Sequence, residues 1–90
     1  MSKVILITGT STGMGKITAL SLAKSGYTVI ATMRDTNGVN QKTANELSEI
    51  SNIEVVDLDV TNDVSVDTTI KSILKKHGKI DVLVNNAGVA

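Results

Sequence analysis

A short stretch near the N-terminus combines residue types that bind phosphate: Thr8-Gly9-Thr10-Ser11-Thr12-Gly13-Met14-Gly15. Four apolar residues at 4–7 precede it, as in a buried strand, and a helical pattern follows at once. A helix N-terminus offers backbone N–H groups without intrahelical partners and the positive end of the helix dipole, while glycine lets an anion approach the backbone. The stretch therefore predicts a phosphate site at a junction of strand and helix.

The spacing of the glycines distinguishes between the known phosphate motifs. A P-loop requires glycine, four residues and then Gly-Lys-Ser/Thr, but Thr10 stands at its first position and Ile17 at its last. The strict dinucleotide fingerprint G-x-G-x-x-G also fails, because Thr18 stands where the third glycine is required. The pattern that fits the chain is Thr-Gly-x-x-x-Gly-x-Gly.

The rest of the chain supplies the elements that must position this turn. We expect strands at 4–7, 27–32, 53–60 and 80–84, and helices at about 13–25, 41–50 and 63–77. The strands are apolar without strict alternation, which is typical of strands covered on both faces. Their alternation with helices predicts a parallel α/β sheet with right-handed crossovers, and no linker or repeat divides residues 1–90 into smaller domains.

Apolar spacing also predicts where the helices lie. The first helix has Ile17, Leu20 and Ala23 at helical spacing, and the third has Ile73 and Leu74 on its apolar face. Thr61 or Asn62 can cap the third helix, which ends in Lys75-Lys76-His77-Gly78, with His77 as a cation at the helix C-terminus. The second helix is thinly apolar, so we expect it to be peripheral, and we expect 80–84 to be a buried strand.

Composition excludes several classes of partner and site. The 90 residues carry nine basic and nine acidic side chains, and this zero net charge removes the electrostatic case for nucleic acid or an anionic membrane. The absence of cysteine excludes disulfides, thiolate metal sites and a cysteine nucleophile, and no His/Asp/Glu cluster has metal-ligand spacing. No apolar stretch is long enough for a signal peptide or membrane span, so a cytoplasmic protein is the default expectation.

Two further motifs follow the third and fourth predicted strands, namely Asp59-Val60 and Asn85-Asn86-Ala87-Gly88. Together with the glycine pattern they resemble, over the whole chain, the short-chain dehydrogenase/reductase family. The resemblance implies a Rossmann-type sheet with strand order 3-2-1-4 and helices on both faces, whose ligands lie at the carboxyl ends of the strands. It also implies an oxidoreductase that transfers hydride between a nicotinamide cofactor and an alcohol or carbonyl compound.

The resemblance implies a set of cofactor-binding residues. In the loop these are Gly9, Ser11, Thr12, Gly13, Met14 and Gly15. The glycines would permit the turn, the approach of the pyrophosphate and close packing of helix on strand, and the two hydroxyls would donate to phosphate oxygens.

Residues after the third and fourth strands would bind the rest of the dinucleotide. Asp59 would accept from the adenine amino group, with Val60 against the ring, although a loop-capping role for Asp59 stays open and Asp57 lies only two residues away. The segment of Asn86, Ala87 and Gly88 would line the nicotinamide–ribose side, and a purely structural role for Asn86 stays open.

The choice between NADP(H) and NAD(H) depends on the residues after the second strand. NAD enzymes place a carboxylate about twenty residues after the glycine loop to accept from the ribose hydroxyls. Met33 stands at that position here and Arg34 follows it, so a guanidinium can pair with a 2′-phosphate. We therefore expect NADP(H) to be favoured over NAD(H). Asp35 is the alternative, since a strand ending one or two residues later would make it the acid.

The family's acid/base groups, a serine and a Tyr-x-x-x-Lys pair, have no match in the chain. Tyr27 is the only tyrosine, and Ala31 stands where that pattern requires lysine. We therefore expect no catalytic residue here and interpret residues 1–90 as the cofactor-binding part of a truncated oxidoreductase, inactive alone. A non-catalytic dinucleotide-binding or sensing module is the alternative. The fourth strand would form an exposed sheet edge, which predicts a homo-oligomer or another association through 80–84.

Overall fold

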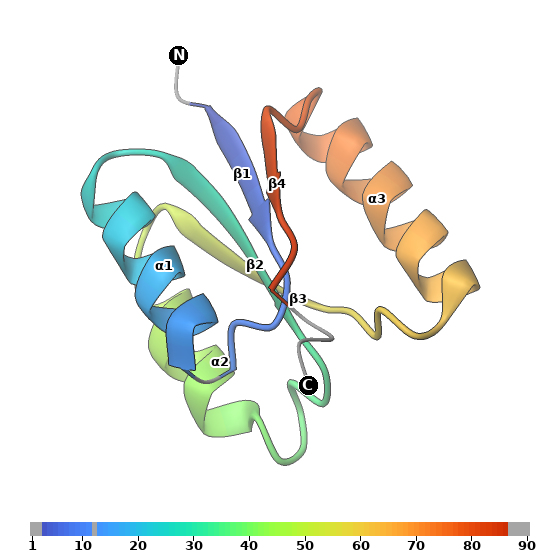
Figure 1. Ribbon diagram of the computed structural model, residues 1–90, viewed down its shortest axis with the longest axis horizontal. Coiled ribbons are helices and arrows are strands. Elements are labelled where there is room, and N and C mark those ends of the chain that lie inside the picture. Colours follow the sequence, from blue (N-terminus) through green and yellow to red (C-terminus); the bar gives the residue numbers. More distant parts are fainter. Residues whose placement is uncertain (1–2, 12, 87–90) are drawn as a thin grey trace.

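Strands and helices alternate along the chain in the computed structural model, which describes residues 3–11 and 13–86. Within these residues the elements are β1 (Val4–Ile7), α1 (Gly13–Lys24), β2 (Thr28–Met33), α2 (Gln41–Ser48), β3 (Ile53–Asp57), α3 (Asp63–His77) and β4 (Val82–Val84). All neighbouring strands are parallel, and their order in the sheet is β3-β2-β1-β4 (Figure 1). This Rossmann-type α/β sheet confirms the predicted fold class and strand order.

Helices cover both faces of the sheet, α1 and α2 on one face and α3 on the other (Figure 1). The core on the α1 and α2 face consists of Ile5, Ile7, Ala19, Ala23, Val29, Ala31, Met33, Ala44, Leu47 and Ile53. The core on the α3 face is smaller and consists of Val4, Leu6, Ile30 and Ile73. Successive residues of β1 and β2 alternate between these cores, which explains why both strands read as continuous apolar runs.

The sheet-facing side of α1 consists of small residues. Gly15, Ala19 and Ala23 are its buried residues, at a spacing of four, whereas Ile17 and Leu20 are exposed. Ile17 and Leu20, whose spacing predicts the helix, therefore do not mark the side that packs on the sheet. Small side chains let the helix lie close to the sheet, and they carry too little hydrophobicity for an apolar pattern to identify them.

The ends of two strands and the burial of a third differ from the predicted ones. β2 ends at Met33, one residue beyond its predicted end, and β3 ends at Asp57, not at residue 60. In β4, Val82 is 42% and Leu83 60% exposed, so the predicted burial of this strand is wrong. Among the described residues β4 pairs with β1 alone, at the end of the sheet, and has no second strand to cover its outer side.

The third helix carries the predicted end signals. The prediction left Thr61 and Asn62 open as the N-cap, and the structure selects Asn62, whose side chain accepts a hydrogen bond from Ser65 N; Gly78 follows the last helical residue. Of the two residues named on its apolar face, Ile73 is buried against the sheet, whereas Leu74 is 42% exposed. The single buried residue of α3 matches the small size of the core on this face.

Candidate functional site

The carboxyl ends of all four strands lie at one edge of the sheet. Ile7 at the end of β1 is in register with Ala31 and Val84, and Met33 is in register with Asp57. The segments that follow the strands therefore meet along this edge, and they carry the predicted site residues. Open α/β sheets bind ligands at this edge, next to the strand where the order reverses.

The glycine turn after β1 is attached to both neighbouring strands. On one side Thr8 N donates to the carbonyl oxygen of Val84 at 3.0 Å. On the other side Thr10 donates twice to the carbonyl oxygen of Thr32, from its N–H at 3.1 Å and from its hydroxyl at 3.0 Å. The side chains of Thr10 and Thr32 are almost fully buried. The turn is thus held at the centre of the sheet by bonds that need no ligand.

Asn86 holds the turn from the β4 side. Its backbone N–H donates to the Thr8 hydroxyl at 2.9 Å, and its side-chain Nδ2 donates to the carbonyl oxygen of Gly9 at 3.2 Å. These bonds give Asn86 the structural role that the sequence left open, beside any contact with a ligand. The other residues predicted in this segment, Ala87 and Gly88, lie outside the described residues, as does Thr12.

The geometry of the glycines fits the approach of a phosphate group. Gly9 and Gly13 have φ angles of 68° and 59°, in the region that favours glycine. A Cβ on Gly13 would have no described atom within 4 Å apart from the neighbouring residues and the backbone of its own helix. The backbone at Gly13 therefore faces open space. A Cβ on Gly15 would instead overlap the carbonyl oxygen of Gly9 and come within 2.7 Å of Asn86 Nδ2. The turn therefore offers accessible backbone at Gly13 and close helix packing at Gly15.

The remaining residues of the turn lie around this opening. Ser11 is half-buried, and the Met14 side chain is 69% exposed in the first turn of α1. No acidic residue is present in this first turn, in contrast to α3, where Asp63 occupies it. A helix N-terminus without a carboxylate of its own leaves its positive end available to an anionic ligand.

Arg34 and Asp59 come together at the ends of β2 and β3. The two ends are joined by a hydrogen bond from Leu58 N to the carbonyl oxygen of Met33, at 2.9 Å. Thr61 donates to Asp59 Oδ1 from its hydroxyl at 2.6 Å and from its N–H at 2.9 Å. These bonds, with a smaller contribution from the charge of Arg34, hold the pKa of Asp59 below its ordinary value. Asp59 is thus an ionised carboxylate that caps its loop and lies within the field of Arg34.

The structure separates Asp57 from Asp59, which the sequence did not. Asp57 Oδ2 accepts from the N–H of Thr36 at 3.1 Å and from its hydroxyl at 2.9 Å, and it therefore contacts the segment after β2. Val60, beside Asp59, is half-buried. Sequence reasoning assigned no role to Thr36, and a lone threonine in a polar segment carries no signal of a partner twenty-one residues away.

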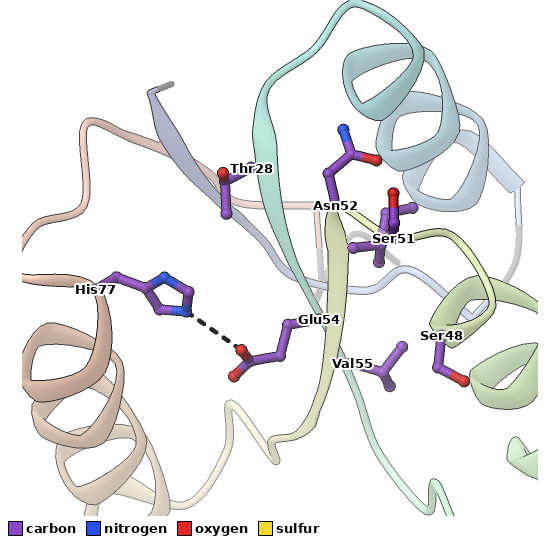
Figure 2. Close-up of a pocket in the computed structure, with 8 residues that line it drawn as sticks. Thr28, Ser48, Ser51, Asn52, Glu54, Val55 and His77 are labelled. Atoms are coloured by element: carbon purple, nitrogen blue, oxygen red, sulfur yellow. Dashed lines mark hydrogen bonds and ion pairs between the residues drawn. The ribbon is translucent and has the colours of Figure 1, made fainter. Parts of the chain in front are cut away.

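A hollow of about 510 Å³ lies elsewhere, along the outer edge of β3 (Figure 2). Its lining includes Thr28 and Asn52, at the amino ends of β2 and β3, so it is at the opposite end of the strands from the glycine turn. His77 Nε2 lies 3.2 Å from Glu54 Oε1 at its rim, as Figure 2 shows. His77 therefore joins the end of α3 to β3 and has no contact with the candidate site.

Comparison of the sequence with known protein families identifies the family of this chain. The family described as short chain dehydrogenase matches residues 3–90. The chain belongs to the short-chain dehydrogenase family. Its members are oxidoreductases, and the glycine turn, Asp59 and Asn86 lie in the matched part.

Individual members of the family cover nearly all of this chain. It is 38% identical over 87 residues to 3-ketodihydrosphingosine reductase from Bacteroides thetaiotaomicron, an alignment covering 97% of this chain and 29% of that protein. It is 39% identical to NADPH-dependent pterin aldehyde reductase from Arabidopsis thaliana, covering 97% of this chain and 36% of that protein. The chain thus spans about a third of the length of these short-chain dehydrogenases, at their N-terminal part.

Solved structures of short-chain dehydrogenases have the same fold. ElxO with NADP bound superposes with a TM-score of 0.86 at 41% identity, over 100% of this chain and 36% of that chain. A short-chain dehydrogenase from Streptomyces avermitilis superposes with a TM-score of 0.82 at 38% identity, over 98% of this chain and 31% of that chain. In the present chain, no helix among the described residues could cross a membrane, and no three His, Asp or Glu residues among them are placed to hold a metal ion.

Proposed function

We propose that residues 1–90 form one dinucleotide-binding domain, the NADP(H)-binding part of a short-chain oxidoreductase that acts on an alcohol or carbonyl compound. A bound nicotinamide dinucleotide supplies the hydride in such reactions. The residues of this chain would bind and orient that cofactor at the carboxyl ends of the strands. The NADP-bound relative and the NADPH-dependent relative support a cofactor of this class.

One observation carries the preference for NADP(H): Arg34 directly follows Met33, the last residue of β2, at the edge of the sheet where β3 also ends. A guanidinium can form two parallel hydrogen bonds with a phosphate, so Arg34 would pair with the 2′-phosphate of the adenosine ribose. Asp59 would accept from the adenine amino group, with Val60 against the ring. Asp35, the alternative carboxylate, has a φ of 51° and its carbonyl oxygen accepts from Gly38 and Asn40 within its own loop.

The pyrophosphate would lie over the glycine turn, where the Gly13 backbone faces open space. The N–H groups of the first turn of α1, from Gly13 through Gly15, would donate to its oxygens, together with the hydroxyls of Ser11 and Thr12. The segment of Asn86, Ala87 and Gly88 would line the nicotinamide–ribose side, beside the bonds of Asn86 to the turn.

Exchange of the charge at Arg34 tests this proposal. We expect Arg34→Asp to weaken NADPH binding by about tenfold to a hundredfold and to leave NADH binding unchanged or stronger. Lys75→Asp makes the same charge change in the last turn of α3, away from the site, and should alter neither affinity. Calorimetric titration of each variant with both cofactors gives the ratio, and an unchanged ratio in Arg34→Asp would refute the proposed preference.

The second candidate is a cofactor-binding or sensing module without catalytic activity. Tyr27, the only tyrosine of the chain, packs against the core on the α1 and α2 face, so it would not serve as a proton donor in either candidate. The two candidates differ in one assay. A catalytic chain oxidises bound NADPH when a carbonyl substrate is added, whereas a sensing module binds NADPH and leaves it unchanged.

We further propose that the chain associates with a second copy through β4. Val82 and Leu83 expose apolar side chains on opposite faces of this strand, since they are in register with Ile5 and Leu6 of β1. A strand at the end of a sheet presents backbone groups that can pair with another strand. Association through this edge would pair those groups and bury both side chains.

A further inference from the structure

The loop that carries Arg34 is folded on itself by its own polar groups. Asn40 Nδ2 donates to the carbonyl oxygen of Arg34 at 2.6 Å. The carbonyl oxygen of Asp35 accepts from the N–H groups of Gly38 at 3.0 Å and Asn40 at 3.1 Å. Asp35 lies in the left-handed region, which aspartate tolerates better than most residues. The loop therefore has a defined conformation in which the backbone at Arg34 is tied to the start of α2.

A second attachment joins the same loop to the neighbouring strand. Asp57 is the last residue of β3, in register with Met33, and its Oδ2 accepts both hydrogen bonds from Thr36. Thr36 lies two residues after Arg34, while Asn40 fixes Arg34 itself. The position of Arg34 along the edge of the sheet is thus set from two sides, by a carboxylate on β3 and an amide before α2.

We propose that Asp57 is a positioning residue for cofactor choice: through Thr36 it holds the loop so that Arg34 meets the 2′-phosphate, without touching the cofactor itself. The inference rests on the proposed function, in which Arg34 recognises NADP(H). The residue that it adds to the site, Asp57, carries a negative charge and would repel a phosphate. Asp57 therefore acts by fixing geometry and not by attraction.

The sign of its charge makes the inference testable. If Asp57 acted on the cofactor through its charge alone, its removal would strengthen NADPH binding, because a carboxylate repels a 2′-phosphate. If it positions Arg34, its removal weakens NADPH binding, because the guanidinium must then be ordered when the ligand binds. The two effects have opposite directions on the same measured affinity.

The experiment compares the affinities for NADPH and NADH in Asp57→Ala and Asp57→Asn, using the full chain. We expect Asp57→Ala to weaken NADPH binding about tenfold and to leave NADH within about twofold, the size of one or two exposed hydrogen bonds. Asp57→Asn keeps an acceptor oxygen for Thr36 and should stay close to the unaltered chain. Gly38→Ala is the matched control in the same loop, because its Cβ would make only ordinary contacts, 3.6 Å from Asp35 Cβ.

Combination with Arg34→Ala distinguishes positioning from a general loss of structure. If Asp57 acts through Arg34, the double variant binds NADPH no more weakly than Arg34→Ala alone. Equal losses for NADPH and NADH in Asp57→Ala, stronger NADPH binding, or additive losses in the double variant would each overturn the inference. If Arg34→Ala itself leaves the cofactor ratio unchanged, the proposed preference fails as well, whereas a shift in Arg34→Ala alone refutes only the role of Asp57.

Thr36→Val supplies a second variant if Asp57→Ala does not fold. It removes the hydroxyl donor to Asp57 and keeps the N–H donor, so we expect the same selective loss for NADPH at about half its size on the free-energy scale. Amide hydrogen exchange of Thr36 in the ligand-free chain should be slowed by Asp57 and faster in Asp57→Ala. Unchanged exchange in that variant, or an unchanged cofactor ratio in Thr36→Val, contradicts the inference.

Discussion

Thr10 and Thr32 meet at the carboxyl ends of β1 and β2, where both the N–H and the hydroxyl of Thr10 donate to the carbonyl oxygen of Thr32. The hydroxyl of Thr32 in turn donates to the carbonyl oxygen of Ile7 at 2.9 Å. Since Arg34 lies two residues after Thr32, these buried bonds fix the distance between the glycine turn and the loop that carries Arg34. The two halves of the candidate site are therefore placed by the sheet itself.

Removal of one of these hydroxyls should weaken both cofactors alike. Thr32→Val replaces a buried hydroxyl with a methyl group of similar size and leaves the Ile7 carbonyl oxygen without that donor. We expect the free energy of unfolding to fall by about 1 kcal/mol and the affinities for NADPH and NADH to fall by the same factor. Urea unfolding followed by circular dichroism, with titrations, measures both. Thr28→Val, at the other end of β2, is the matched control, and a loss confined to NADPH would contradict the prediction.

The close contact of α1 with the turn predicts a strong effect of a single methyl group. In Gly15→Ala the new Cβ would overlap the Gly9 carbonyl oxygen, so α1 must move away from the turn. We expect a loss of about 3 kcal/mol in the free energy of unfolding, at the upper end for overpacked sites, together with the loss of cofactor binding. Gly38→Ala should be nearly neutral, and similar thermal midpoints for the two variants would show that the packing at Gly15 is not tight.

The contact between α3 and β3 predicts a dependence of stability on pH. Burial raises the pKa of Glu54, but hydrogen bonds and charges from Lys76 and His77 outweigh it and hold the pKa below its ordinary value. A carboxyl with a lowered pKa in the folded state contributes stability above its unfolded pKa and loses it as pH falls through the folded pKa.

Glu54→Gln tests this contribution. The variant should be less stable than the unaltered chain at about pH 7, and the difference should shrink towards about pH 3.5 in urea unfolding. The lowered pKa values of Asp59 and Asp81 leave a remaining acid dependence of the same sign. A difference that grows as pH falls would contradict the assigned role of Glu54.

Association through β4 predicts that a charge on this strand favours the monomer. Leu83→Lys places a cation on an exposed side chain of the edge strand, and such charges oppose pairing of sheet edges. We expect self-association about tenfold weaker by analytical ultracentrifugation. Val39→Lys makes the same change at a loop residue that is 84% exposed and should leave association unchanged. An unaltered chain that stays monomeric at all concentrations would refute the proposed interface.

The sequence predicted the fold because its strongest patterns agree with one another. The apolar runs, the glycine turn and the cap before the third helix are local signals, and they place the elements in the right order, with differences at the ends of β3 and β4. Its errors arise where tertiary contacts decide. Ile17 has the hydrophobicity of a core residue, but the close approach of α1 selects the smaller Ala19 for the sheet.

The roles of the two carboxylates could not be read from their positions in the sequence. Asp57 and Asp59 are only two residues apart in the sequence. The partner of Asp57, Thr36, precedes it in the chain, whereas the partner of Asp59, Thr61, follows it. Because β3 ends at Asp57, Asp57 lies beside the loop that carries Arg34, whereas Asp59 lies beyond the strand. Polar contacts between segments distant in sequence, such as Thr10 with Thr32, leave no periodic signal.

Binding of NADP(H) across the glycine turn and the Arg34 loop can be tested by titration of the isotopically labelled chain with NADPH, followed through the backbone amide resonances. We expect the amides of Gly13, Gly15, Arg34 and Asp59 to shift, while those of Glu54 and His77 at the β3 hollow do not. Absence of shifts in the turn, or shifts confined to the β3 hollow, would contradict it.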